Sequence, residues 1–166
     1  MLSDNSVTRT RITIPRRRQD LITRQRLLDS LNDLIDNRLI LITAPAGYGK
    51  TSLLVDFASH TNYPVCWYTV SPLDIELQRF IYNLISALAI QFPHFGQRTT
   101  SALKSTKGTL DPEYIATVII NDLYDHVQEH FVLVLDDYYL INDSILSPVQ
   151  LFSAAVMVFA IIKLKN

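Results

Sequence analysis

The stretch from Ala44 to Thr51 carries residue types that bind phosphate groups. It fits the Walker A pattern G-x-x-x-x-G-K-[ST] at every position except the first, where alanine replaces glycine. Gly47 and Gly49 allow backbone angles that turn consecutive N–H groups toward an anion. Lys50 supplies a positive charge to the phosphates, and Thr51 supplies a hydroxyl to Mg²⁺. The sequence therefore predicts a phosphate-binding loop made of Ala46, Gly47, Tyr48, Gly49, Lys50, Thr51 and Ser52.

An acidic pair follows a second apolar run further along the chain. Residues 131–135 are continuously apolar, and Asp136 and Asp137 come directly after them. A phosphate-loop site needs a carboxylate at the end of an adjacent strand to hold Mg²⁺, which is the role expected for Asp136. Asp137 is a candidate to orient or deprotonate an attacking water. Lys50 and Asp137 are thus the candidate catalytic residues, and Thr51 and Asp136 are the candidate metal ligands.

Both patterns also have purely structural interpretations, in which the residues bind no ligand. The loop can be a tight turn from a strand to a helix that binds nothing, and the acidic pair can simply follow a strand end. The apolar run before the loop and the amphipathic spacing after it favour the phosphate-binding interpretation.

Hydrophobic spacing predicts the elements that must position these residues. Residues 39–43 are typical of a strand buried on both faces, and a helix is expected from Lys50 onward. The order of the expected elements implies an α/β fold with a parallel central sheet and crossover helices. The remaining expectations are a helix capped by Thr23, a strand over 65–70, a helix from Ser71-Pro72 to Phe92, a loop over 94–110 that can hold a short helix, a helix from Asp111-Pro112, and a strand over 131–135.

Composition excludes several classes of protein. The chain has 166 residues and a mass of 18.9 kDa, with 48% apolar and 19% charged residues, as expected for one folded domain. Its single cysteine, Cys66, excludes an intramolecular disulfide framework and is expected to be a small buried hydrophobe. Tyr138 and Tyr139 are expected to pack beneath the site. No secretory signal is visible, which predicts a cytoplasmic protein.

Charge is distributed unevenly along the chain. Residues 1–26 contain seven arginines and two aspartates, whereas the other 140 residues contain eight basic and fourteen acidic side chains. A basic start of this kind can bind nucleic acid or serve as a transit peptide. The favoured interpretation is a solvated segment whose arginines pair with the acidic body, with residues 1–15 as an irregular or extended basic arm.

The segments quoted above resemble the ATP-binding domain of the large MalT-type transcriptional regulators of bacteria. These LuxR-family proteins are signal-transduction NTPases with numerous domains. The resemblance rests on Pro45–Thr51 and Leu135–Tyr138, together with Leu21–Leu28, a segment that in the family lies against the adenine. It implies a P-loop NTPase three-layer sandwich over residues 16–143, with ATP and Mg²⁺ as cofactors. It also implies a switch between resting and self-associated states, and at most slow Mg²⁺-dependent ATP hydrolysis.

The chain departs from the family after residue 143. Residues 144–166 form an apolar tail, and its nearly continuous apolar run, residues 149–162, is fourteen residues long, which is too short to span a bilayer. Either a buried helix or strand, or the truncated or frame-shifted end of a longer gene, accounts for it. The sheet is therefore expected to be incomplete at its C-terminal side, and no DNA-binding domain or membrane partner is expected in this chain. The possible partners are a second copy or other domains of a longer regulator.

Two other functions remain open on the sequence. A stand-alone kinase or NTPase that acts on a small-molecule acceptor would use the same loop. It would need a basic lid, for which Arg98, Lys104 and Lys107 are the candidates. A non-functional gene remnant is the other alternative.

Overall fold

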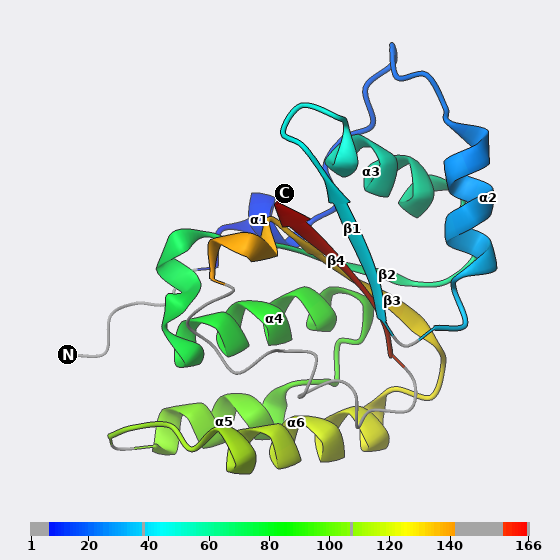
Figure 1. Cartoon of the computed structure of the whole chain (residues 1–166). Helices are drawn as coiled ribbons and strands as arrows, with labels where there is room; N and C mark the ends of the chain where they lie inside the picture. Colours follow the sequence, from blue (N-terminus) through cyan, green and yellow to red (C-terminus); the bar gives the residue numbers. More distant parts are fainter. Residues whose placement is uncertain (1–6, 38, 107, 142–157, 166) are drawn as a thin grey trace.

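The chain folds around a small parallel β-sheet with helices on both of its faces (Figure 1). The computed structural model describes residues 7–37, 39–106, 108–141 and, as backbone, 158–165. The expected α/β class and parallel sheet are confirmed. The strand order is β1-β4-β3-β2, and each neighbouring pair is parallel. The strands are β1 (Leu39–Ala44), β2 (Val65–Thr69), β3 (Phe131–Asp136) and β4 (Val158–Lys165).

Two groups of helices cover the two faces of the sheet (Figure 1). The group on one face consists of α2 (Gln25–Asp33) and α3 (Lys50–His60). The group on the other face consists of α4 (Leu77–Gln91), α5 (Gln97–Ser105) and α6 (Pro112–His126). The short helix α1 (Arg9–Ile12) and two 3₁₀ turns, η1 (Pro72–Ile75) and η2 (Tyr138–Leu140), complete the described elements. No helix in these described ranges is long and apolar enough to cross a membrane.

The position of β3 between two layers of helices explains why residues 131–135 are continuously apolar. Leu133 and Leu135 pack into the core on the side of α4, α5 and α6, whereas Val132 and Val134 pack into the core on the side of α2 and α3. A strand that is covered on both faces has no position for a polar side chain. The prediction of a strand buried on both faces is therefore confirmed for β3.

The same prediction is wrong for β1. Ile40 is 6% exposed and belongs to the core beneath α2 and α3, but Leu41, which points to the opposite face, is 51% exposed. Leu41 is exposed because β1 is an edge strand. The larger core beneath α4, α5 and α6 is centred on β2 and β3.

Part of the apolar tail forms a strand inside the sheet. Residues 158–165 make up β4, which pairs with β1 on one side and with β3 on the other. Leu41 is aligned with Ile162, and Val134 is aligned with Ile161. The expectation that Asp136 ends a strand adjacent to that of the loop is thus wrong, because one strand separates β1 from β3. Residues 142–157 of the tail region lie outside the described residues.

Local signals were accurate at some helix starts and misleading at others. Asp111 accepts the Glu113 N–H at 3.0 Å, which confirms the predicted start of α6. Thr23 does not cap α2, because its hydroxyl accepts a hydrogen bond from Arg17 and the capping position is occupied by Arg24. The helix expected from Ser71-Pro72 is divided into η1 and α4, since Glu76 has an extended backbone with ψ of 116°.

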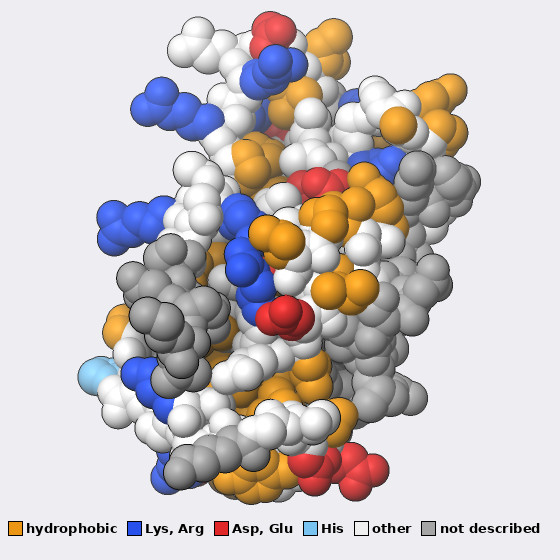
Figure 2. All heavy atoms as spheres, turned by 90° about the vertical axis from the view of Figure 1, so that its left-hand side faces the viewer, with side chains coloured by type: hydrophobic (Ala, Val, Ile, Leu, Met, Phe, Trp, Pro, Cys, Tyr) orange, Lys and Arg blue, Asp and Glu red, His pale blue; other side chains and the backbone are white. Residues whose placement is uncertain are grey.

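The N-terminal arginines contact the body of the protein. Arg11 pairs with the buried Asp74, and Arg17 donates to the buried Asp56 at 2.8 Å. Residues 9–12 form α1 rather than an extended arm, and Ile12 is buried. On the face drawn in Figure 2, Lys and Arg side chains are spread among hydrophobic and polar ones instead of gathering into one basic surface. These contacts favour arginines that pair with the acidic body over an arm that binds nucleic acid.

Candidate nucleotide-binding site

The loop between β1 and α3 has backbone angles that glycine adopts more easily than other residues. Gly47 has a φ of +83° and Gly49 a φ of +73°, both in the left-handed region. Gly49 occupies the capping position of α3, so the free N–H groups of the first turn follow it directly. A β-carbon on Gly49 would also come within 2.7 Å of Nη2 of Arg24. The backbone angle therefore favours glycine at both positions, and a side chain at the second would also have to move the end of the Arg24 side chain.

A cavity of about 310 Å³ opens beside this loop. Most residues of the predicted cofactor-binding set line it. Asp137 and Tyr139 contribute the wall that follows β3. The full lining is Ala46, Gly47, Gly49, Lys50, Thr51, Ser52, Asp137 and Tyr139. The structure thus brings the loop and the segment that follows β3 to one cavity, although they are far apart in the sequence.

A second cavity of about 500 Å³ adjoins the same loop. Gly47, Gly49 and Ser52 line both cavities. Tyr48, which is 67% exposed, lines the second cavity rather than the first. The opposite wall comes from the segment that precedes α2, through Arg18, Asp20, Leu21, Ile22 and Arg24.

Lys50 contacts the carbonyl groups of its own loop. Its ammonium group donates to the carbonyl oxygens of Ala44 and Pro45, the latter at 3.0 Å. In this folded-back position the ammonium group lies against two main-chain carbonyl groups of the loop. An anion in the cavity would compete with two neutral carbonyl groups for this ammonium group.

Thr51 and Asp136 contact each other at the carboxyl-terminal end of the sheet. The Thr51 hydroxyl lies 3.3 Å and 3.2 Å from the two carboxylate oxygens of Asp136. Asp136 is 3% exposed, and its carbonyl oxygen accepts the Val70 N–H at 2.8 Å, which ties the end of β3 to the end of β2. The two predicted metal ligands are therefore neighbours.

The two residues after Asp136 differ in their environments. Asp137 is the only described non-glycine residue with a positive φ, 59°, and it precedes η2. Tyr138 is 3% exposed and packs in the core, as expected, and burial raises the pKa of its hydroxyl to about 12. Tyr139 instead lines the cavity. Tyr138 and Tyr139 are consecutive residues of the 3₁₀ turn η2, in which neighbouring side chains point in different directions.

Sequence reasoning missed the arginines of the segment before α2. Arg24 donates to the carbonyl oxygen of Tyr48 at 3.1 Å and to that of Gly49 at 2.7 Å. Arg17 connects the same segment to α3. The many arginines were visible in the sequence, but the acceptors of Arg24 in the loop and of Arg17 in α3 are 24 to 39 positions away, so no local pattern indicated these contacts.

The candidate lid residues of the kinase alternative lie elsewhere. Arg98 pairs with Asp125 of α6, and Lys104 is an exposed residue of α5. Helix α5 packs in the layer opposite to α3 (Figure 1). Lys107 lies outside the described residues. The structure does not bring Arg98 or Lys104 to the loop cavity.

Fold and site together define an α/β protein with a glycine-containing loop from strand to helix that faces a buried carboxylate. The chain is similar over most of its length to bacterial transcriptional regulators. It is 30% identical over 143 residues to the HTH-type transcriptional regulator MalT of Klebsiella pneumoniae subsp. pneumoniae. It is 32% identical over 148 residues to that of Yersinia enterocolitica, and 31% identical over 145 residues to that of Yersinia pestis.

Each of these alignments covers 86% of this chain but 16% of the regulator. The chain thus spans about one sixth of the length of the curated relatives it matches. No family model matches the chain. The similarity supports a MalT-like regulator at the level of the family.

Proposed function

We propose that this chain is the ATP-binding switch module of a MalT-like, LuxR-family transcriptional regulator, with a P-loop NTPase fold and weak or no ATP hydrolysis. The observation that carries the proposal is the contact of Thr51, which lines the loop cavity, with Asp136, whose carboxylate oxygen lies 3.2 Å from the Thr51 hydroxyl. A hydroxyl and a buried carboxylate at the start of a helix form the oxygen donor set that Mg²⁺ takes together with phosphates.

The loop cavity fits the phosphate groups of a nucleotide. The two left-handed glycines and the N-terminus of α3 supply main-chain N–H donors, and Lys50 supplies the positive charge. Thr51 and Asp136 are the residues that would hold Mg²⁺, and the metal would neutralise part of the phosphate charge. These residue types match a polyanion with a divalent cation better than a neutral ligand.

The larger cavity is the place for the nucleoside. It shares Gly47, Gly49 and Ser52 with the phosphate side, so one ligand can extend across both cavities. The resemblance places Leu21–Leu28 against the adenine, and Leu21 and Ile22 line this cavity. Together with Tyr48 they offer apolar and aromatic surface to the flat face of a base.

A regulatory role is favoured over metabolic phosphoryl transfer. The aligned relatives are regulators, and this chain aligns with only 16% of their length, so other regulator domains or a second copy are the proposed partners. The kinase alternative needs basic residues at the cavity, but Arg98 is paired on α6. A cytoplasmic location is part of the proposal.

Isothermal titration calorimetry with Mg-ATP tests the proposal. The wild-type protein should bind, and Lys50→Ala should weaken binding roughly 100-fold, the value of a lost contact between a charged donor and an anion. Lys104→Ala is the matched control, since it removes an exposed lysine on the opposite layer. Equal affinities of the wild type and Lys50→Ala would show that the site is wrongly assigned. Turnover of ATP that depends on a small-molecule acceptor would favour the kinase alternative.

Asp137 is the proposed hydrolytic residue. Asp137→Asn suits its backbone, because asparagine also tolerates a positive φ. The variant should keep the wild-type affinity for Mg-ATP and lose whatever slow phosphate release the wild type shows. Phosphate release that is unchanged in Asp137→Asn would remove Asp137 from the proposed machinery.

A further inference from the structure

The wall of the larger cavity is a segment without regular structure. Residues 18–24 belong to no helix or strand, and five of them, Arg18, Asp20, Leu21, Ile22 and Arg24, line the cavity. Within the segment, the Leu21 N–H donates to the Arg18 carbonyl at 3.3 Å. Such a segment has many conformations available in the absence of tertiary contacts. Its shape must therefore be set by the side chains that bind it to the rest of the protein.

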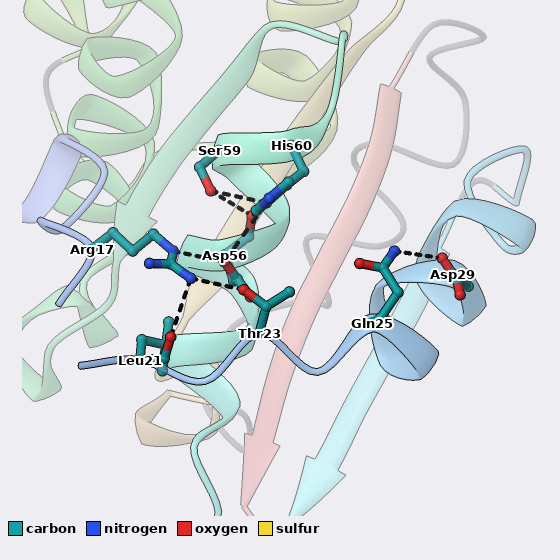
Figure 3. A network of polar contacts seen from close by, with 8 residues as sticks. All are labelled: Arg17, Leu21, Thr23, Gln25, Asp29, Asp56, Ser59 and His60. Atoms are coloured by element: carbon teal, nitrogen blue, oxygen red, sulfur yellow. Dashed lines mark hydrogen bonds and ion pairs between the residues drawn. The ribbon is translucent and has the colours of Figure 1, made fainter. Parts of the chain in front are cut away.

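Arg17 binds three acceptors at once, from two different parts of the chain (Figure 3). Its Nε donates to Oδ1 of Asp56 in α3 at 2.8 Å. Its Nη2 donates to the hydroxyl of Thr23 at 2.8 Å and to the carbonyl oxygen of Leu21 at 3.3 Å. The planar guanidinium group thus joins the cavity wall to the helix that starts at the phosphate loop.

Asp56 is held firmly as the anchor of this junction. Its side chain is 3% exposed, whereas that of Arg17 is 33% exposed. The Nδ1 atom of His60 lies 3.6 Å from Oδ1 of Asp56 and 2.7 Å from its carbonyl oxygen, and the Ser59 hydroxyl donates to the same carbonyl at 2.7 Å. A buried carboxylate needs its cationic partner, which makes Arg17 difficult to displace.

Arg24 fixes the other end of the wall. Its two hydrogen bonds end on the carbonyl oxygens of Tyr48 and Gly49. The wall is consequently clamped at both ends, by Arg17 to the middle of α3 and by Arg24 to the loop. Neither Arg17 nor Asp56 lines the larger cavity.

We propose that the Arg17–Asp56 pair is a positioning device for the nucleoside part of the ligand. It holds residues 18–24 against α3 so that the base finds a preformed wall, and it leaves the phosphate loop itself unaffected. The inference rests on the proposed function and adds to it. The pair makes the site prefer a nucleoside triphosphate over an inorganic triphosphate, because only the nucleoside uses the wall.

The test compares two ligands, Mg-ATP and Mg-tripolyphosphate, in the full chain. The main variant is the double substitution Arg17→Met/Asp56→Leu, since replacing both partners of a buried ion pair by apolar residues is often neutral for stability. Binding of Mg-ATP should weaken about tenfold in the double variant, whereas binding of Mg-tripolyphosphate, measured by competition, should stay within about twofold. The midpoint of thermal unfolding checks that the variant is folded.

Two further variants make the result specific. Arg17→Lys keeps the charge but cannot reach three acceptors with a planar fork, so it should show an intermediate loss of Mg-ATP affinity. Arg9→Met is the matched control, because Arg9 is an exposed arginine of α1 outside the cavity lining. It should leave both affinities unchanged.

The outcomes separate the two proposals. An unchanged ratio of the two affinities in the double variant, or an equal loss for both ligands, would overturn the inference and leave the proposed function standing. Failure of the wild-type protein to bind Mg-ATP would overturn both. A ratio that falls in a folded double variant, with Arg9→Met unchanged, supports the positioning role.

Discussion

The hydroxyl of Thr51 lies 3.2 Å from a carboxylate oxygen of Asp136, although 85 positions separate the two residues in the chain. The contact is made across the sheet, since β4 lies between the strands that lead to the two residues. The contact depends on the parallel arrangement of the strands, which places the carboxyl-terminal ends of all four strands at the same end of the sheet. The loop and both cavities lie at this carboxyl-terminal end of the sheet.

Removal of the Asp136 carboxylate should abolish the effect of magnesium on nucleotide binding. We expect Asp136→Asn to weaken Mg-ATP binding by about 10- to 100-fold, the usual cost of losing a group that orients a metal. Calorimetry with and without a chelator is the measurement. Wild-type affinity should fall when magnesium is removed, and the affinity of Asp136→Asn should not change. Asp33→Asn, an exposed carboxylate of α2, serves as the control. A magnesium effect retained in Asp136→Asn would contradict the assignment.

The two glycines of the loop should respond differently to alanine. Gly47→Ala adds a β-carbon with nothing within 4 Å, so it should cost only the strain of a positive φ, about 1 kcal/mol of unfolding free energy. Gly49→Ala should cost more, because its β-carbon displaces the Arg24 side chain and its two hydrogen bonds.

A double-variant cycle with Arg24→Ala isolates this second contribution. Urea unfolding of Gly49→Ala, Arg24→Ala and the combination should show that the two changes are not additive, since both remove the same hydrogen bonds. Strict additivity would mean that Arg24 yields to the new methyl group without loss.

Asp74 should make stability depend on pH. Burial alone would raise the pKa of this carboxyl group, but the N–H of Ser71, at 2.7 Å, and the guanidinium group of Arg11 lower it below its ordinary value. A carboxyl group whose pKa is depressed by folding stabilises the protein at neutral pH, and this stabilisation is lost as the pH falls through that depressed pKa. Asp74→Asn should therefore lower the free energy of unfolding by about 3 kcal/mol at neutral pH.

Urea unfolding at several pH values checks this expectation. The difference in stability between the wild type and Asp74→Asn should shrink as the pH is lowered from neutral toward about 3. The exposed Asp33→Asn should match the wild type throughout. A difference that stays constant down to the acid end would show that the charge of Asp74 does not stabilise the fold.

The thiol of Cys66 should not react with alkylating or disulfide reagents in the folded protein. It is 1% exposed in β2, and burial raises the pKa of its thiol to about 12. Only the thiolate reacts with alkylating and disulfide reagents, so the native protein should not react at mildly alkaline pH. The same protein in concentrated urea should react with one equivalent of reagent. Rapid reaction of the native protein would indicate frequent opening of β2.

Sequence patterns were sufficient for the parts of the fold that local physics specifies. The glycines, lysine and threonine of the loop, the aspartate cap of α6 and the continuous apolar run of β3 each depend on neighbours within a few residues. The candidate site residues were selected on the same grounds, and the structure brings Gly47, Lys50 and Asp137 to one cavity. Backbone angles, caps and periodicity are short-range properties, so a sequence displays them directly.

Tertiary structure alone decided which distant groups meet. The insertion of residues 158–165 between β1 and β3, the exposure of Leu41 and the pairing of Arg17 with Asp56 have no local signature. Strand order and long-range ion pairs depend on how all layers pack together, and a one-dimensional pattern does not encode that packing. The sequence by itself therefore predicted a strand, a glycine loop and a helix suited to phosphate, together with Asp136 as the candidate carboxylate, whereas the three-dimensional fold determined that Asp136 and the arginines lie against this loop and helix.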